Sequence, residues 1–104
     1  MKFLKKLIKI KTDARKIGKR RIIKYTSNAN TLERLAGGDL DATLTDLKRT
    51  QKLADVVDEQ TYQAWTKSDL KTLLKMLWKV ANGYDQEDQP KEIRNIKGRP
   101  NARE

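Results

Sequence analysis

Residues 66–81 read TKSDLKTLLKMLWKVA, and no other segment shows its secondary structure as plainly. Apolar residues recur at spacings of three and four, and lysines recur every four residues on another face, which is typical of an amphipathic helix. Thr-Lys-Ser-Asp at 66–69 has the form of a capping box, and Asn82-Gly83 is a stop signal. We therefore expect a helix over 66–81, with these inward residues: Leu70, Leu73, Leu74, Leu77, Trp78, Val80 and Ala81.

The same start occurs earlier in the chain, where TLTDLK at 43–48 matches TKSDLK at 66–71. The match is explained if two helix starts independently acquired the same favourable N-cap sequence, and an internal repeat is the alternative. It predicts a helix from Thr43 to about Asp58, with Leu44, Leu47, Ala54 and Val57 inward. Between the two helices, we expect Tyr62 and Trp65 to seal the core.

Farther upstream, Gly37-Gly38-Asp39 is the strongest break in the chain and ends a helix that begins near Gly18. Residues 2–16 also have apolar side chains at helical spacing and predict a first helix. The inward residues expected in these two helices are Leu4, Leu7 and Ile8, then Ile22, Ile23, Ala29, Leu32, Leu35 and Ala36.

Four helices with short connections and no competing strand pattern predict an all-α fold, a small four-helix bundle. We expect residues 1–83 to form this domain. Residues 84–104 hold an acidic run and two prolines, and we expect them to be a linker or a mobile tail.

Composition argues against catalysis. The chain has 104 residues, no Cys and no His, and so lacks common nucleophiles and metal ligands. Seven of its fourteen carboxylates fall at predicted helix starts, in a turn and in the acidic run 85–88, where solvation is their expected role. The glycine pair follows a helix, whereas a phosphate-binding loop precedes one. We expect no enzyme activity, metal, cofactor or small-molecule substrate.

Apolar runs in the sequence are short. The longest holds two or three residues, which is too few for a transmembrane helix or a signal peptide. We therefore expect a soluble, cytoplasmic protein.

The positive charge is concentrated at one end of the chain. The net charge is +10, and residues 1–25 carry all of it, because they hold eleven basic residues and one acid. Such a block implies a polyanionic partner, either nucleic acid or an anionic membrane. A helix with Lys19, Arg20, Arg21 and Lys24 near its N-terminus suits phosphate binding, although a solvated helix face explains the same residues.

Residues 65–71 read WTKSDLK, a lysine-rich helix follows, and residues 90–97 read PKEIRNIK. This order resembles the end of the core-binding domain in archaeal members of the tyrosine recombinase (phage integrase) family. The family commonly shows Trp-Thr-Lys-x-Asp, a basic amphipathic helix, a short loop and Pro-x-Glu-(Val/Ile)-Arg-x-Ile-Lys. Residues 18–36 resemble its second helix and residues 42–47 the start of its third, so the resemblance covers about 16–97.

The resemblance implies an orthogonal four-helix, SAM-like domain that forms one jaw of a C-shaped clamp around duplex DNA. In the family, the second and fourth helices face the major groove and its phosphates. By position, the implied DNA-binding residues are Lys19, Arg20, Lys24, Ser27, Asn28 and Thr31 on the second helix, and Thr66, Lys67, Lys71 and Lys75 on the fourth.

The same resemblance bears on activity and partners. The family's catalytic Arg, His and Tyr belong to a C-terminal domain that this sequence does not contain, so we expect binding without cutting or joining. The catalytic domain of the same recombinase and self-association on DNA are further partners that it implies. A nucleoid-associated location follows from DNA binding.

A different hypothesis starts from residues 1–11, where Phe3, Leu4, Leu7 and Ile8 are interspersed with five lysines. Such a helix can lie on an anionic membrane or pack on a protein partner. Eleven residues are short for anchoring, and the lysine stems can instead cover apolar surface of the bundle. DNA binding is the leading hypothesis, and membrane or protein-partner binding is the alternative.

Overall fold

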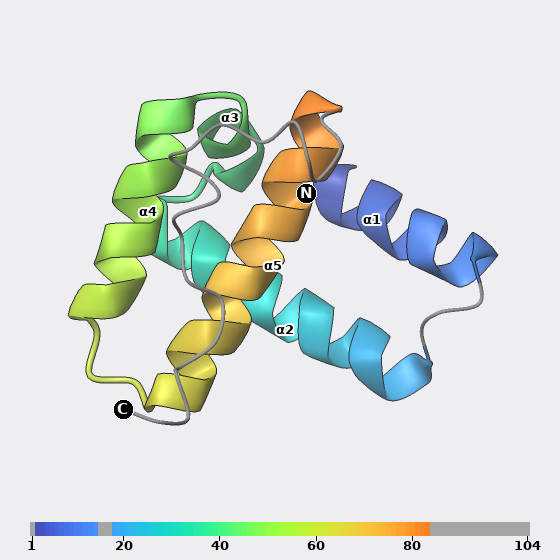
Figure 1. Ribbon diagram of the computed structural model, residues 1–104, viewed down its shortest axis with the longest axis horizontal. Coiled ribbons are helices and arrows are strands. Elements are labelled where there is room, and N and C mark those ends of the chain that lie inside the picture. The colour runs from blue at the N-terminus through green and yellow to red at the C-terminus, as the bar shows by residue number, and fades with distance from the viewer. Residues whose placement is uncertain (1, 15–17, 84–104) are drawn as a thin grey trace, which may run out of the picture.

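The computed structural model describes residues 2–14 and 18–83, which form α-helices joined by short turns (Figure 1). The described residues contain no strand, so the all-α prediction is confirmed. The end of the first predicted helix and the predicted tail at 84–104 lie outside the described residues. The helices are α1 (Lys2–Asp13), α2 (Lys19–Leu35), α3 (Leu40–Leu44), α4 (Leu47–Glu59) and α5 (Ala64–Asn82).

The described residues form five helices and not the expected four, because a short helix, α3, occupies Leu40–Leu44 and the helix expected from Thr43 begins at Leu47. The Asp39 carboxylate caps α3 by accepting from the backbone N–H of Ala42 at 3.0 Å. Asp46 caps α4 in the same way, through the N–H of Arg49 at 3.2 Å. Asp46 therefore begins a new helix, and the predicted start at Thr43 is wrong.

The predicted capping box at 66–69 is also wrong. α5 begins two residues before the expected position, and its N-cap, Gln63, makes no side-chain capping bond. The backbone N–H of Lys67 donates to the carbonyl of Gln63 at 3.1 Å, so Thr66 already lies in the first turn. The two matching sequence segments thus occupy different helix positions, and they are not a structural repeat.

Glycine ends two helices, as predicted. After α2, the N–H groups of Gly37 and Gly38 donate to the carbonyls of Arg34 and Glu33 at 3.2 and 2.9 Å, which is a Schellman motif. Gly37 has φ of 86°, and Gly83 at the end of α5 has φ of 69°. This left-handed conformation is unfavourable for residues with a Cβ, so glycine is the residue that fits both ends.

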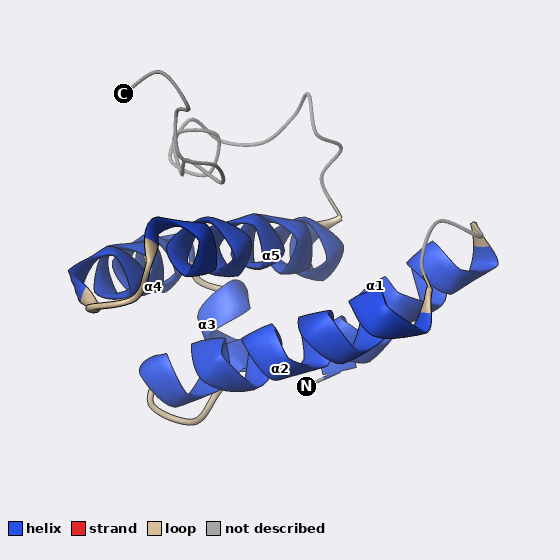
Figure 2. Cartoon of the chain, turned by 90° about the horizontal axis from the view of Figure 1, so that it is seen from below, coloured by secondary structure: helices blue, strands red, loops and turns tan. Residues whose placement is uncertain are grey.

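The helices lie in two layers with α5 at the centre. α4 and α5 form one layer, α1 and α2 form the other, and α3 lies between them (Figure 2). α5 packs against each of the other four helices. The helix that the sequence predicts most clearly is therefore the one that joins the layers.

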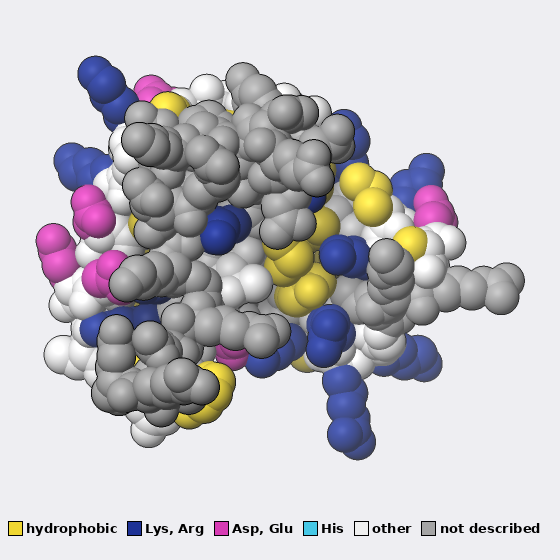
Figure 3. Space-filling model, viewed as in Figure 1, with side chains coloured by type: hydrophobic (Ala, Val, Ile, Leu, Met, Phe, Trp, Pro, Cys, Tyr) yellow, Lys and Arg dark blue, Asp and Glu magenta, His cyan; other side chains and the backbone are white. Residues whose placement is uncertain are grey.

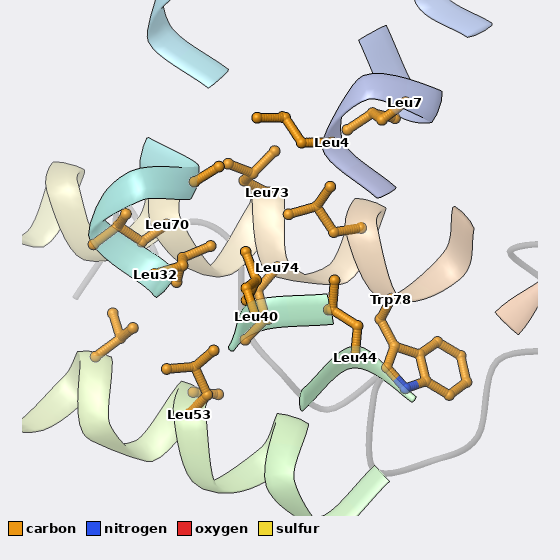
Figure 4. Close-up of a cluster of buried hydrophobic side chains, with 14 residues drawn as sticks. Leu4, Leu7, Leu32, Leu40, Leu44, Leu53, Leu70, Leu73, Leu74 and Trp78 are labelled. Carbon is orange, nitrogen blue, oxygen red and sulfur yellow. The ribbon is translucent and has the colours of Figure 1, made fainter. Parts of the chain in front are cut away.

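A leucine-rich core connects the two layers (Figure 4). Leu70, Leu73, Leu74, Leu77 and Trp78 of α5 are all at most 3% exposed, which confirms the predicted inward face. Each fully buried leucine stabilises the fold by about 1.5–3 kcal/mol relative to an exposed one. The other helices contribute Leu4, Leu7, Ala29, Leu32, Leu40, Leu44, Leu53, Ala54 and Val57.

Two predicted core residues face solvent instead. Ile23 is 68% exposed, because the inward stripe of α2 passes through Tyr25, Ala29 and Leu32 on another side of the helix. Trp65 is 70% exposed, and the prediction that it seals the core is wrong. Tyr62 does pack partly against the core, as expected.

Candidate nucleic-acid interface

The first turns of α2 present cations to solvent. Lys19, Arg20 and Arg21 are exposed. Gly18 precedes the helix with an extended backbone and no side-chain capping bond, and the first turn holds no acidic residue. Cations at a helix N-terminus are unfavourable for the helix itself, whereas a phosphate bound there is favoured by the amide groups and the dipole. This end of α2 is therefore suited to an external anion.

Lys24 lies farther along α2 and reaches across to α5. Its Nζ lies 2.9 Å from Oδ2 of Asp69, and the two side chains are 57% and 41% exposed. A pair this exposed contributes on the order of 0–1 kcal/mol, so a phosphate can replace the carboxylate at low cost. The contact also shows that the polar side of α2 lies beside the first turns of α5.

Three polar residues continue this side of α2. The Thr31 hydroxyl donates to the backbone carbonyl of Ser27 at 3.2 Å, so its hydrogen is used within the helix. The Ser27 side chain is exposed, and Asn28 is half-buried. We call the six predicted residues of α2 the α2 basic face: Lys19, Arg20, Lys24, Ser27, Asn28 and Thr31.

Lys67 and Lys71 of α5 turn toward α4, where Asp58 engages both. Lys71 Nζ lies 2.7 Å from Asp58 Oδ1, and the Lys71 side chain is only 14% exposed. Lys67 Nζ donates to the backbone carbonyl of Asp58 at 2.7 Å, near the C-terminus of α4, where the helix dipole favours a cation. We call these three residues the Asp58 cluster. Its lysines stabilise the contact between α4 and α5, and they are less available to DNA than expected.

The remaining predicted residues of α5 are Thr66 and Lys75. Thr66 is exposed in the first turn, and Lys75 is half-buried farther along the helix. Within residues 2–14 and 18–83, Lys75 forms no ion pair.

The ten predicted residues do not form one continuous surface. The α2 basic face lies on the side where Lys24 meets Asp69, whereas the Asp58 cluster lies on the side of α5 that meets α4. The structure thus brings the polar side of α2 close to the start of α5, but it places Lys67 and Lys71 elsewhere.

α1 adds cations that the predicted site did not include. Leu4 and Leu7 are buried against the bundle, whereas Lys5, Lys6 and Lys9 are exposed. In Figure 3, Lys and Arg side chains gather on the side where α1 and the start of α2 lie, and several Asp and Glu side chains lie over α4. The described cations of α1 and of the start of α2 therefore lie on one side of the folded molecule.

Sequence reasoning also missed Trp65 as a surface residue. It lies in the first turn of α5, four residues before Asp69, and both side chains lie on a face beside the buried Leu70 and Leu73. Helical spacing counted from Ala64 would have separated Trp65 from the leucine stripe.

The described part of the chain offers no other obvious chemistry. No group of three or more acidic residues within it is arranged to hold a metal ion. None of the described helices is long and apolar enough to cross a membrane.

Comparisons with known proteins give no family for the chain. No family model, no curated protein and no solved structure matches it.

Proposed function

We propose that this protein is a non-catalytic duplex-DNA-binding domain and that the α2 basic face makes its main contact. The observation that carries the proposal is the group of exposed cations at the start of α2, next to the lysines of α1. Lys and Arg at such positions bind backbone phosphates and supply affinity without reading sequence. Ser27 and Asn28, on the same face, are available for hydrogen bonds to phosphates or base edges.

The finer proposal is that the domain is one jaw of a tyrosine recombinase clamp, with the catalytic domain of the same recombinase as the other jaw. The resemblance at 65–71 and 90–97 supports it, and so does an all-α fold in which a basic α2 lies beside the start of α5. In this proposal, the fourth helix of the family corresponds to α5. In the same proposal, the protein is associated with the nucleoid, and copies of this chain associate with one another on DNA.

A salt titration tests DNA binding. If about six phosphates are engaged, log K falls against log salt with a slope near −5. The affinity for a labelled duplex, measured by fluorescence anisotropy between low and physiological salt, gives this slope. A flat response contradicts the proposal, because phosphate contacts must release counterions.

A groove between α1 and α5 favours protein-partner binding as a second candidate function. It encloses about 380 Å³, with Leu7, Ile10, Met76 and Val80 among its apolar lining. Lys6, Lys11 and Lys79 also line it. An acidic segment with an apolar anchor fits this combination of charge and shape.

The same part of the structure gives less support to membrane binding. Leu4 and Leu7 are at most 5% exposed, so the apolar face of α1 that would enter a membrane is largely used in the core. Co-sedimentation with anionic vesicles, compared with a duplex titration at the same salt, distinguishes the two partners. Binding to vesicles but not to duplex would contradict the DNA-binding proposal.

A further inference from the structure

The feature that the proposed function leaves unexplained is the exposed indole of Trp65. Among the described residues, Trp65 is the most exposed large apolar residue, at 70%. Trp78, the other tryptophan, is 3% exposed. Tryptophan is usually well buried, because its large apolar ring is costly to hydrate. Exposed aromatic rings are instead enriched where a partner covers them.

Two side-chain contacts fix the position of Trp65 relative to α2. Three residues before it, the Tyr62 hydroxyl accepts from Nη2 of Arg34 at 3.0 Å. Four residues after it, Asp69 pairs with Lys24 at 2.9 Å. The start of α5 therefore lies against α2 between these two contacts, and Trp65 lies between them in the sequence.

Two cations of α2 contact residues close to Trp65 in the sequence. Arg34 contacts Tyr62, before Trp65, and Lys24 contacts Asp69, after it; both cations are exposed. An aromatic ring flanked by exposed cations fits a nucleotide, because the ring can stack on the base while the cations hold the phosphates.

The geometry of DNA limits which base the ring can contact. An intact duplex presents only base edges in its grooves, since the faces of its bases are stacked on one another. Stacking on the indole therefore requires a base with a free face, as at a gap or in a single strand.

We propose that Trp65 stacks on an unpaired base, so that the protein binds gapped DNA more tightly than intact duplex. This inference rests on the proposed function and adds a preferred DNA structure to it. The cations bind the phosphates of gapped DNA and of intact duplex alike, and stacking on Trp65 supplies the additional affinity for gapped DNA. About a ten-fold preference lies at the weaker end of what one stacked base gives.

The test compares two labelled DNAs with the full chain at one salt concentration. One is an intact duplex, and the other is the same duplex with a short single-stranded gap. We expect the gapped DNA to bind about ten-fold more tightly. W65A should abolish this preference and leave the affinity for intact duplex within about two-fold, and W65F should retain part of the preference.

I23A is the matched control, because Ile23 is 68% exposed on the outer side of α2. We expect it to keep the full preference. Because both side chains are exposed, thermal melts by circular dichroism should show that both variants stay folded.

Each outcome separates this inference from the proposed function. Equal binding of the two DNAs, or a preference that survives W65A, overturns the role of Trp65 while duplex binding stands. A shift of W65A in sedimentation with an unchanged DNA preference also overturns it, because the indole would then bind a second copy of the chain. Failure of both DNAs to bind overturns the proposed function itself.

Discussion

The double variant K19Q/R20Q should weaken duplex binding far more than K67Q/K71Q, although each removes two positive charges. Lys19 and Arg20 are exposed and pair with no acid among the described residues. Each phosphate contact contributes about 0.9 to the slope of log K against log salt. Loss of two contacts should change the slope by about 2 and lower the affinity near 0.1 M salt by about 60-fold.

We expect K67Q/K71Q to lower the duplex affinity less, because both lysines belong to the Asp58 cluster. The Lys71 side chain is 14% exposed and already holds the Asp58 carboxylate. At most one of the two lysines is therefore available to a phosphate, and the slope should change by less than about 1. D58N is the converse variant, because it removes the competing carboxylate, and it should tighten binding.

Anisotropy titrations of one duplex at several salt concentrations give all four slopes, with the wild type included. Thermal melts check that the variants are folded. Asp58 is 54% exposed, so its ion pair with Lys71 contributes at most about 1 kcal/mol to stability. Equal losses in the two double variants, or a larger loss for K67Q/K71Q, would refute the reasoning. The Asp58 cluster would then have to open on DNA, and α5 would carry the main contact.

Three further predictions concern stability, each measured by denaturant unfolding followed by circular dichroism. W78A should cost about 3–5 kcal/mol, because the ring is 3% exposed in the core, and a loss below 1 kcal/mol would contradict its central packing. G37A should cost about 1 kcal/mol, since φ is 86°, and G37N should cost less; equal costs would contradict the left-handed cap. T50V should cost about 1 kcal/mol, because the buried hydroxyl of Thr50 lies 2.9 Å from two backbone carbonyls, and an unchanged midpoint would contradict that bond.

Local periodicity was enough to predict much of the fold. The alternation of apolar and basic residues along α5 depends on neighbours three and four positions away, and the buried face it predicts is confirmed. The glycines after α2 were predicted for a similar reason, since their conformation is set by the adjacent turn.

The errors arose at the starts of helices and in contacts between residues distant in sequence. Asp69 was expected to cap its own helix, but α5 begins before Thr66, and the Asp69 carboxylate pairs with Lys24 of α2. The matching segment at 43–48 does not reveal that Asp46, and not Thr43, is the N-cap. Local pattern alone does not decide between such partners, because the choice depends on how the helices pack.

The candidate site shows the same limit. The sequence placed ten polar residues on helix faces, but it held no signal that Asp58 would bind Lys67 and Lys71 from α4. It also did not show that Trp65 lies outside the core, because the helix was expected to begin at Thr66 and Trp65 was assigned to the connection before it.

The central claim is that DNA lies against the start of α2, and amide chemical shifts of the full chain during titration with a duplex test it most directly. We expect the largest shifts at residues 19–31 and in the first turn of α5, with small shifts over the second half of α4. Shifts confined to α4, or none at saturating duplex, would contradict the account.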